Sequence, residues 1–332
     1  MIDARDARWL GAALALAERG VGRTSPNPSV GCIVVADNRV VARGWTQPGG
    51  RPHAEAMALA AAGNAARGAT AYVTLEPCAH VSARGPACSD LLIAAGVARV
   101  VASGIDPDPR TAGAGVARLR AAGIVVDVAA PALATTAERL NAGFFTRQRE
   151  GRAHVTLKLA VSLDGCLALA DGTSRWITGA AARRHSHLER ARCDLIVVGG
   201  GTLVADNPAL DVRLDGLEDR APQRAVLSAT LEAIPEGARI GDARLLRDLS
   251  DLDADPRILT VLVEGGAGAA TSLLAADRVD RLLIYRAPII LGGRRGIGDL
   301  GLTDLGSAHG RWRLAASLTL GLDRVEEYDR VR

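Results

Sequence analysis

Hydrophobic positions in the first third of the chain switch repeatedly between helical and strand spacing. Residues 6–19 carry apolar side chains at helical intervals, whereas residues 31–35 and 39–44 form two short runs on either side of Asp37-Asn38, which predicts a hairpin. The same criteria predict helices over 52–62, 89–95 and 115–122, and strands over 69–75, 99–102 and 124–128. This alternation of helices and strands predicts an α/β sandwich.

A second series of strands begins after Gly151. Residues 132–149 are predicted to form one continuous helix that ends at this glycine. Strands are predicted over 154–160, 195–198, 224–227, 258–263 and 281–285, with helices between several of them. Because 332 residues exceed what one hydrophobic core usually serves, we expect two α/β domains, 1–150 and 151–332.

Composition excludes several classes of partner. The chain is 48% hydrophobic and 23% charged, as in ordinary globular proteins. Its net charge of +3 forms no basic stripe, and 3% aromatic residues are too few for a base-stacking platform, so we expect a small-molecule substrate and no nucleic acid. The first twenty residues lack a basic leader with an apolar run, and no apolar run approaches about 18 residues, so we expect a cytoplasmic protein without a membrane partner.

Two cysteines, one histidine and one glutamate form the most specific motif. His53 and Glu55 open a predicted helix, Cys78 follows a predicted strand, and Cys88 comes ten residues later. Catalytic zinc takes three nitrogen or sulfur ligands and keeps a fourth position for water. We therefore predict that His53, Cys78 and Cys88 bind Zn²⁺. Glu55 lies close by without being needed as a ligand, so it could carry protons, and this pattern is typical of zinc deaminases.

Other interpretations of this motif remain open. Nine residues separate Cys78 from Cys88 where the short form of the motif has two, so the cysteines could instead be buried residues or part of a structural zinc clip. A zinc-stabilised binding module would then fold around the metal and show no turnover. The same zinc set also serves deaminases of free nucleosides or of tRNA. Asn27, held between two prolines, is either a substrate contact or part of a turn.

The second half contains glycine-rich turns after two predicted strands. Residues 199–202 and 263–268 have the glycines and helix start that suit a phosphate group, but neither segment matches the dinucleotide fingerprint or the P-loop. Simple tight turns would look the same. Of the 40 basic residues only Lys158 is a lysine, so this position could need a compact charge or a group that gives up its proton.

Together these motifs resemble the bifunctional riboflavin-biosynthesis deaminase/reductase family over nearly the whole chain. The residues that carry the resemblance in the first half are Pro26-Asn27-Pro28, Val30-Gly31, His53-Ala54-Glu55, residues 74–80 and Cys88. Those in the second half are Lys158-Leu159, residues 162–165, Ser174, residues 176–178, Asp206, residues 208–210, Arg213 and residues 263–266.

The resemblance implies a cytidine-deaminase-like N-terminal domain and a dihydrofolate-reductase-like C-terminal domain. It implies that the first domain removes a ring amine from a phosphoribosylated diaminopyrimidine, and that the second reduces the ribosyl group to ribityl with NADPH. We expect the catalytic residues to be Glu55, for proton transfer at the zinc motif, and Lys158, the lone lysine, which lies in the same cluster of motifs. Residues implied to bind NADPH are Val161, Trp176, Thr202, Asp206, Gly266, Ala267 and Gly268. Residues implied to contact substrate are Ser174, Arg190, Leu210, Arg213 and Glu264, in addition to Asn27.

The chain departs from the family pattern at two places. Ser228-Ala229 stands where relatives usually have Asp-Ser, which affects a cofactor contact that the serine normally makes. The zinc loop is one residue longer than in many relatives and carries Ala79 where serine is common. An alternative is therefore a nucleoside or tRNA deaminase whose second domain is inactive or regulatory. A homodimer is the default expectation for the assembly.

Overall fold

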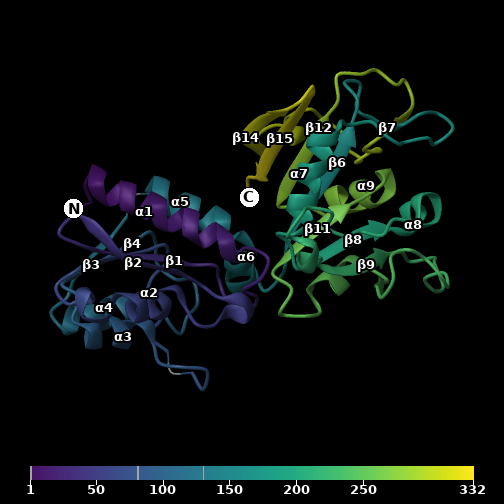
Figure 1. Cartoon of the computed structure of the whole chain (residues 1–332). Helices are drawn as coiled ribbons and strands as arrows, with labels where there is room; N and C mark the ends of the chain where they lie inside the picture. Colours follow the sequence, from purple (N-terminus) through teal and green to yellow (C-terminus); the bar gives the residue numbers. More distant parts are fainter. Residues whose placement is uncertain (1, 81, 130) are drawn as a thin grey trace. The chain divides into compact units, whose positions relative to one another are not determined.

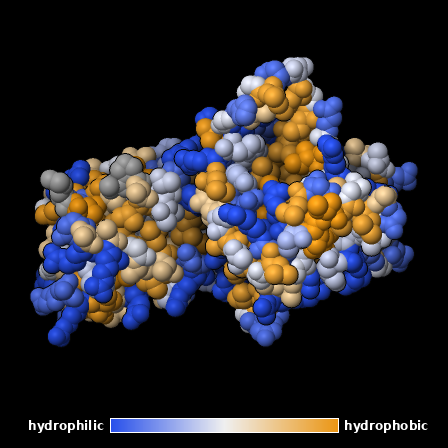
Figure 2. All heavy atoms as spheres, turned by 90° about the horizontal axis from the view of Figure 1, so that it is seen from above, coloured by the Kyte–Doolittle hydropathy of each residue, from blue (hydrophilic) through white to orange (hydrophobic). Residues whose placement is uncertain are grey.

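The computed structural model describes residues 2–80, 82–129 and 131–332. The chain divides after Gly151 into two compact units (Figure 1). Both are α/β units, which confirms the predicted fold class. No helix among the described residues combines the length and apolar character required to span a membrane. On the face seen in Figure 2, hydrophilic and hydrophobic side chains are intermixed on both units.

The first unit is a five-stranded sheet covered by helices on both faces. Its helices are α1 (Ala4–Ala17), α2 (Ala54–Ala62), α3 (Cys88–Ala95), α4 (Ala114–Ala121), α5 (Pro131–Leu140) and α6 (Ala142–Glu150). Its strands are β1 (Gly31–Ala36), β2 (Arg39–Trp45), β3 (Thr70–Val73), β4 (Arg99–Ala102) and β5 (Val125–Val128). The strand order is β2-β1-β3-β4-β5, with β3, β4 and β5 parallel. Figure 1 shows α1 and α5 on one face of this sheet and α2, α3 and α4 on the other, so the predicted sandwich is confirmed.

Local sequence explains the start of this unit. Asp3 forms a capping box with Asp6 at the beginning of α1, which satisfies backbone amides that the helix leaves free. Asp37 and Asn38 connect β1 to β2 with φ angles of 48° and 58°. Positive φ at both positions is the backbone of a type I′ hairpin turn, which matches the predicted hairpin.

The predicted continuous helix over 132–149 is wrong, because the segment is broken at Asn141 into α5 and α6. Asn141 is buried, and its side chain bonds both backbone groups of Ser29. The Ser29 amide donates to Asn141 Oδ1 at 2.7 Å, and Asn141 Nδ2 donates to the Ser29 carbonyl at 3.0 Å. A partner 112 residues away in the sequence therefore sets where the helix is interrupted.

The second unit is built on an eight-stranded sheet. The strands of this sheet are β6 (His154–Val161), β8 (Leu195–Gly199), β9 (Gln223–Leu227), β10 (Arg244–Leu246), β11 (Thr260–Glu264), β12 (Arg281–Arg286), β14 (Trp312–Leu320) and β15 (Asp323–Arg330). The helices are α7 (Ala180–Arg190), α8 (Gly200–Asp206) and α9 (Ala267–Ala275), and β7 (Cys166–Ala168) pairs separately with β13 (Arg294–Arg295). The sheet order is β10-β9-β8-β11-β6-β12-β15-β14.

Six neighbouring strands of this sheet, from β10 to β12, run parallel. Their buried faces supply a core that includes Leu157, Leu195, Val261 and Leu273. The antiparallel hairpin of β15 and β14 completes the sheet. The sequence does not predict this hairpin, because most side chains of β14 are at least partly exposed and its strand pattern is weak.

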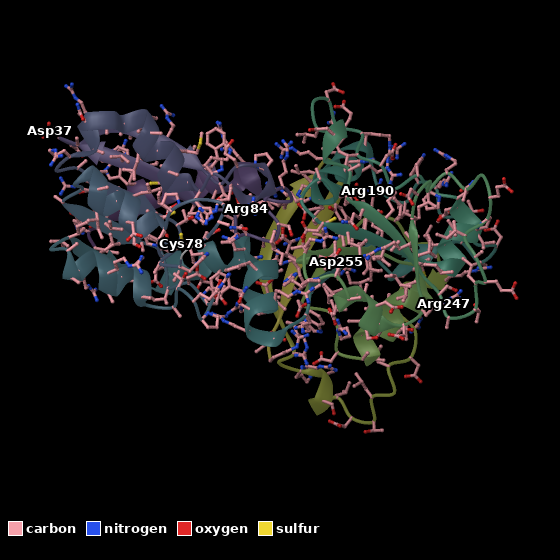
Figure 3. All side chains as sticks on the ribbon, turned by 90° about the horizontal axis from the view of Figure 1, so that it is seen from below. Asp37, Cys78, Arg84, Arg190, Arg247 and Asp255 are labelled. Atoms are coloured by element: carbon pink, nitrogen blue, oxygen red, sulfur yellow. The ribbon has the colours of Figure 1, made fainter. Side chains whose placement is uncertain are left out.

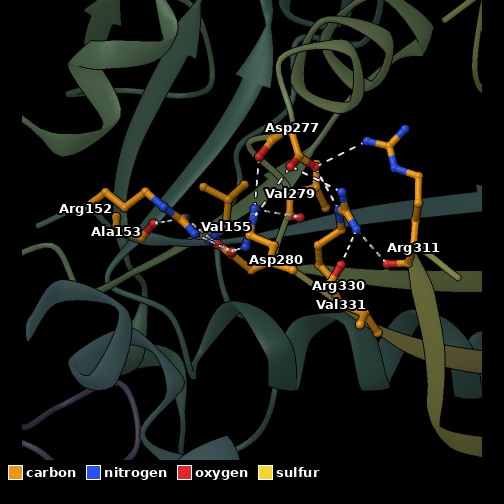
Figure 4. A network of polar contacts seen from close by, with 10 residues as sticks. Arg152, Ala153, Val155, Asp277, Val279, Asp280, Arg311, Arg330 and Val331 are labelled. Atoms are coloured by element: carbon orange, nitrogen blue, oxygen red, sulfur yellow. Dashed lines mark hydrogen bonds and ion pairs between the residues drawn. The ribbon is translucent and has the colours of Figure 1, made fainter. Parts of the chain in front are cut away.

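An arginine–aspartate network fastens the two ends of the second unit (Figure 4). Arg152 donates to both oxygens of Asp280 at 2.7 Å, and Asp280 also accepts the Val155 amide at 2.8 Å. Arg330 pairs with Asp277 at 2.7 Å. The network joins the start of β6 to the loop before β12 and to the end of β15, so charged groups hold the C-terminal hairpin in register.

Candidate functional site

Three side chains in the first unit converge as the sequence predicts for a metal site. The ligand atoms of His53, Cys78 and Cys88 all lie within 4.8 Å of one another. Nδ1 of His53 is 3.3 Å from the Cys88 sulfur and 3.6 Å from the Cys78 sulfur. A nitrogen and a sulfur bound to one tetrahedral zinc ion are about 3.5 Å apart. The donor set and its spacing therefore fit zinc.

The N-terminal ends of two helices position these ligands. His53 precedes the first residue of α2, and Cys88 is the first residue of α3. The Cys88 amide donates to the Cys78 sulfur at 3.3 Å, and the Ser89 hydroxyl donates to the Cys78 carbonyl at 3.0 Å. The start of α3 thus holds Cys78 by its backbone and by its side chain.

The loop before Cys78 is fixed from the other side by α4. The Glu76 carboxylate accepts the amides of Gly113 at 2.9 Å and Val116 at 3.0 Å, which caps the start of this helix. Gly115 has no Cβ, and one placed there would lie 2.0 Å from the Pro77 carbonyl oxygen. A glycine is therefore required for α4 to approach the metal loop this closely.

Glu55 lies in the first turn of α2, two residues after a metal ligand. Its side chain is buried, and burial raises the pKa of its carboxyl group. Hydrogen bonding from the Cys88 thiol, with His53 alongside, lowers the pKa of Cys78 to about 4. A lowered pKa favours the thiolate, which is the form in which cysteine binds zinc.

Asn27 lies against a predicted metal ligand. Its Nδ2 is 3.0 Å from Nε2 of His53, the ring nitrogen opposite the one that faces the cysteines. Metal-binding histidines usually bond their second nitrogen to another group, which fixes the ring. Since Asn27 and His53 are in contact, Asn27 lies at the site, where it can orient His53.

The second unit contains a cavity of about 1220 Å³. Among the residues predicted for cofactor and substrate, those that line it are Lys158, Ser174, Trp176, Arg190, Thr202, Asp206, Leu210, Arg213, Glu264, Gly266, Ala267 and Gly268. Val161 is not among the lining residues, since it is buried at the end of β6. These positions come from β6, β11, α7, α8, the start of α9 and two loops, and the sheet brings them to one place.

A buried charged cluster occupies this cavity. The parallel register of β11 and β6 places Glu264 beside Lys158, whose Nζ is 3.5 Å from the Glu264 carboxylate. Arg190, from α7, donates to both oxygens of Glu264 at 2.6 and 2.9 Å. Burial alone would raise the pKa of Glu264, but Lys158 and Arg190 outweigh burial and lower that pKa to about 2. Glu264 is therefore ionised, and two cations hold it.

The sequence did not single out Tyr285 or His187, which also line the cavity. Lys158 Nζ lies 5.6 Å from the centre of the Tyr285 ring, within range of a cation–π contact. The Tyr285 hydroxyl is 2.8 Å from Nδ1 of His185, and His187 contacts the Asp211 carbonyl at 3.1 Å. The only signal in the sequence was rarity, because the chain has three tyrosines and six histidines.

Both units are similar to known protein families. Residues 3–103 match the family described as cytidine and deoxycytidylate deaminase zinc-binding region, and residues 153–325 match the RibD C-terminal domain. The riboflavin biosynthesis protein RibD of Escherichia coli strain K12 is 41% identical, over 92% of this chain and 94% of that protein.

Two solved structures are similar over almost the entire chain. RibD of Acinetobacter baumannii, form 1, has a TM-score of 0.88 and 34% identity, with 99% of each chain covered. The diaminohydroxyphosphoribosylaminopyrimidine deaminase/5-amino-6-(5-phosphoribosylamino)uracil reductase of Thermotoga maritima has a TM-score of 0.89 and 31% identity, covering 98% of this chain and 99% of that one. The chain therefore belongs to the RibD family of riboflavin biosynthesis proteins, as a bifunctional enzyme with a zinc-dependent deaminase and a reductase.

Proposed function

We propose that residues 1–150 deaminate a phosphoribosylated diaminopyrimidine and that residues 151–332 then reduce its ribosyl group to ribityl with NADPH. The observation that carries the first half of the proposal is the cluster of His53, Cys78 and Cys88 with Glu55 beside it. The second half is supported by the cavity that Lys158 and Glu264 line in the other unit.

For deamination, the three ligands would hold zinc, which supplies a hydroxide nucleophile near neutral pH. Attack on the amine-bearing ring carbon forms a new carbon–oxygen bond and breaks the carbon–nitrogen bond. Glu55 takes a proton from the attacking water and delivers it to the departing nitrogen, which leaves as ammonia. Its buried position beside His53 supports this role, since bulk water does not compete for the proton.

For reduction, NADPH supplies a hydride to the first carbon of the ribosyl group. The sugar must also gain a proton as its ring opens, and Lys158 is the cavity side chain that we assign to deliver it. Glu264 and the ring of Tyr285 hold the Lys158 ammonium in place. Val161, Trp176, Thr202, Asp206 and residues 266–268 are assigned to NADPH.

Substrate contacts in this unit are assigned to Ser174, Arg190, Leu210, Arg213 and Glu264. Arg190 makes two bonds to Glu264 and one to the Asp211 carbonyl, so its chief task in our proposal is to orient Glu264 toward the sugar hydroxyls. Arg213 is 60% exposed on its side chain and is better placed to meet the substrate phosphate.

The test is one assay with two signals. The purified chain receives the phosphoribosyl diaminopyrimidine and NADPH, and both ammonia release and NADPH oxidation are followed. We expect ammonia first, and NADPH oxidation only after deamination. Ammonia release without NADPH oxidation would instead support a deaminase with an inactive second unit, and no ammonia release would refute the deaminase assignment.

The assembly and location stay predictions. A homodimer predicts twice the chain mass by light scattering. An absence of nucleic-acid binding predicts no salt-dependent retention on RNA. A cytoplasmic location predicts recovery in the cytosolic fraction of lysed cells.

A further inference from the structure

The carboxyl ends of the parallel strands in the second unit form one continuous edge. Moving along the sheet from β6, this edge passes β11, β8 and β9 and ends at β10. Neighbouring strands are about 4.8 Å apart, so these four steps extend over about 19 Å. Ligands of parallel α/β sheets bind outside such an edge. The lining of the cavity follows it from Lys158 to Arg247.

The proposed reduction determines where along this edge the nicotinamide of a bound NADPH lies. Lys158 and Glu264 lie on β6 and β11, where the nicotinamide must meet the sugar. The glycine-rich start of α9 follows β11 in the middle of the edge, where backbone amides favour the pyrophosphate. An extended dinucleotide therefore directs its adenosine toward β9 and β10.

Two arginines, Arg239 and Arg247, line the cavity at this adenosine end. Within residues 2–80, 82–129 and 131–332, neither guanidinium forms an ion pair, whereas Arg190 at the reacting end is paired with Glu264. Figure 3 shows Arg190 and Arg247 well apart on the second unit. The far end thus carries positive charge that no carboxylate neutralises.

Arg247 is the better anchored of the two arginines. It directly follows β10, and the amide of Ser228 donates to the neighbouring Leu246 carbonyl at 2.9 Å, which aligns the ends of β9 and β10. The Arg247 guanidinium donates to the carbonyls of Leu231 and, at 2.9 Å, Glu232. Two of its five N–H groups are used this way, which leaves three for a ligand.

The side chains that directly follow β9 provide few hydrogen-bond donors for a phosphate. The Ser228 hydroxyl accepts the Leu231 amide at 3.0 Å and packs against the start of α8, since a Cβ on Gly200 would lie 2.7 Å from it. Ala229 has no polar side chain. A phosphate at the adenosine end must therefore be met by a neighbouring segment, and the one after β10 begins with Arg247.

We propose that Arg247 binds the 2′-phosphate of NADPH and sets the preference of the reductase for NADPH over NADH. The inference rests on the proposed reduction and extends it to cofactor choice. A cation near the adenosine ribose accommodates a 2′-phosphate, whereas a carboxylate there binds the free hydroxyl of NADH. Asp248 is the carboxylate next to Arg247, but it accepts the Ser250 amide at 2.7 Å and caps the short helix that follows.

The experiment measures direct binding of NADPH and of NADH to the full chain by cofactor fluorescence. Arg247→Gln should weaken NADPH binding about 10- to 100-fold, the range for losing hydrogen bonds to a charged group, and leave NADH binding within about twofold. Arg239→Gln is the matched control and should retain the preference. Arg247→Lys should recover part of it, because the charge remains but the paired geometry is lost.

The other outcomes overturn the inference in distinct ways. An unchanged NADPH affinity in Arg247→Gln, or an equal loss for both cofactors, removes the assigned role. A loss of preference in Arg239→Gln alone transfers the role to that residue. If the wild-type chain binds neither cofactor, the proposed reduction itself fails. Cooperative thermal unfolding of each variant, followed by circular dichroism, reports that its second unit is folded, since ammonia release reports only on the first.

Discussion

The two units contain different kinds of functional site, one compact and one extended. In the first unit the ligand atoms of His53, Cys78 and Cys88 lie within 4.8 Å of one another, and backbone groups of α3 and α4 hold the metal loop. In the second unit a cavity of about 1220 Å³ draws residues from most of the sheet, and ion pairs hold its charged groups. A metal concentrates the chemistry on a few side chains, whereas a large cofactor spreads it along a sheet edge.

The strongest test of this contrast is Glu55→Gln. The variant should lose ammonia release by about 10²- to 10⁴-fold, because an amide cannot carry the proton. Zinc content, measured by metal analysis, should remain at one ion per chain, and reduction of the separately supplied deaminated substrate should be unchanged. Exposed Glu138→Gln in the same unit is the control and should be fully active. Substantial ammonia release by Glu55→Gln would refute the proton-carrier role.

The ion-pair network of the second unit predicts the next largest effect. Asp280→Ala removes the buried carboxylate that accepts from the largely buried Arg152 guanidinium and from the Val155 amide, which should cost about 3–5 kcal/mol of unfolding free energy. Urea unfolding, monitored through the loss of NADPH oxidation, measures this change in unfolding free energy. The control is the exposed Asp304→Ala, whose carboxylate bonds only within its own turn. An equally small effect for both variants would show that the network does not stabilise the unit.

Substitution of Lys158 tests the independence of the two activities from the reductase side. Lys158→Met should slow NADPH oxidation about 100-fold and leave ammonia release unchanged. Lys158→Arg keeps the charge but cannot give up a proton at neutral pH. If Lys158 supplies the proton, both variants are slow; if only its charge matters, the arginine variant recovers. A fall in ammonia release in either variant would contradict the division of labour between the units.

The smallest effect is a pH dependence of stability in the second unit. Burial lowers the pKa of His154 to about 4, below its usual 6.5, so the unfolded chain binds a proton between these values while the folded chain does not. Stability from this group is complete above pH 6.5 and falls as pH decreases, by about 2 kcal/mol at pH 5. Urea unfolding at pH 7 and pH 5 measures it, and His154→Gln should lose this part of the pH dependence.

Local patterns predicted most elements of the fold. The hairpin at Asp37-Asn38 and the strand over 99–102 are formed almost as expected, because turn residues and short apolar runs act locally. The predicted continuous helix over 132–149 does not form, because Asn141 interrupts it and makes two hydrogen bonds to the backbone of Ser29. The terminal hairpin of β14 and β15 was missed because pairing with β12, not an apolar run, defines it.

The sequence by itself determined the α/β class and the zinc chemistry, since a metal restricts its ligands to few residue types and these stand in short, recognisable motifs. Only the tertiary structure decided that Glu264 pairs with Arg190 and Lys158, that Tyr285 joins them, and that Arg247 stands at the far end of the cavity. These neighbours depend on the order and register of parallel strands, which join segments up to a hundred or more residues apart, and no local pattern encodes that pairing.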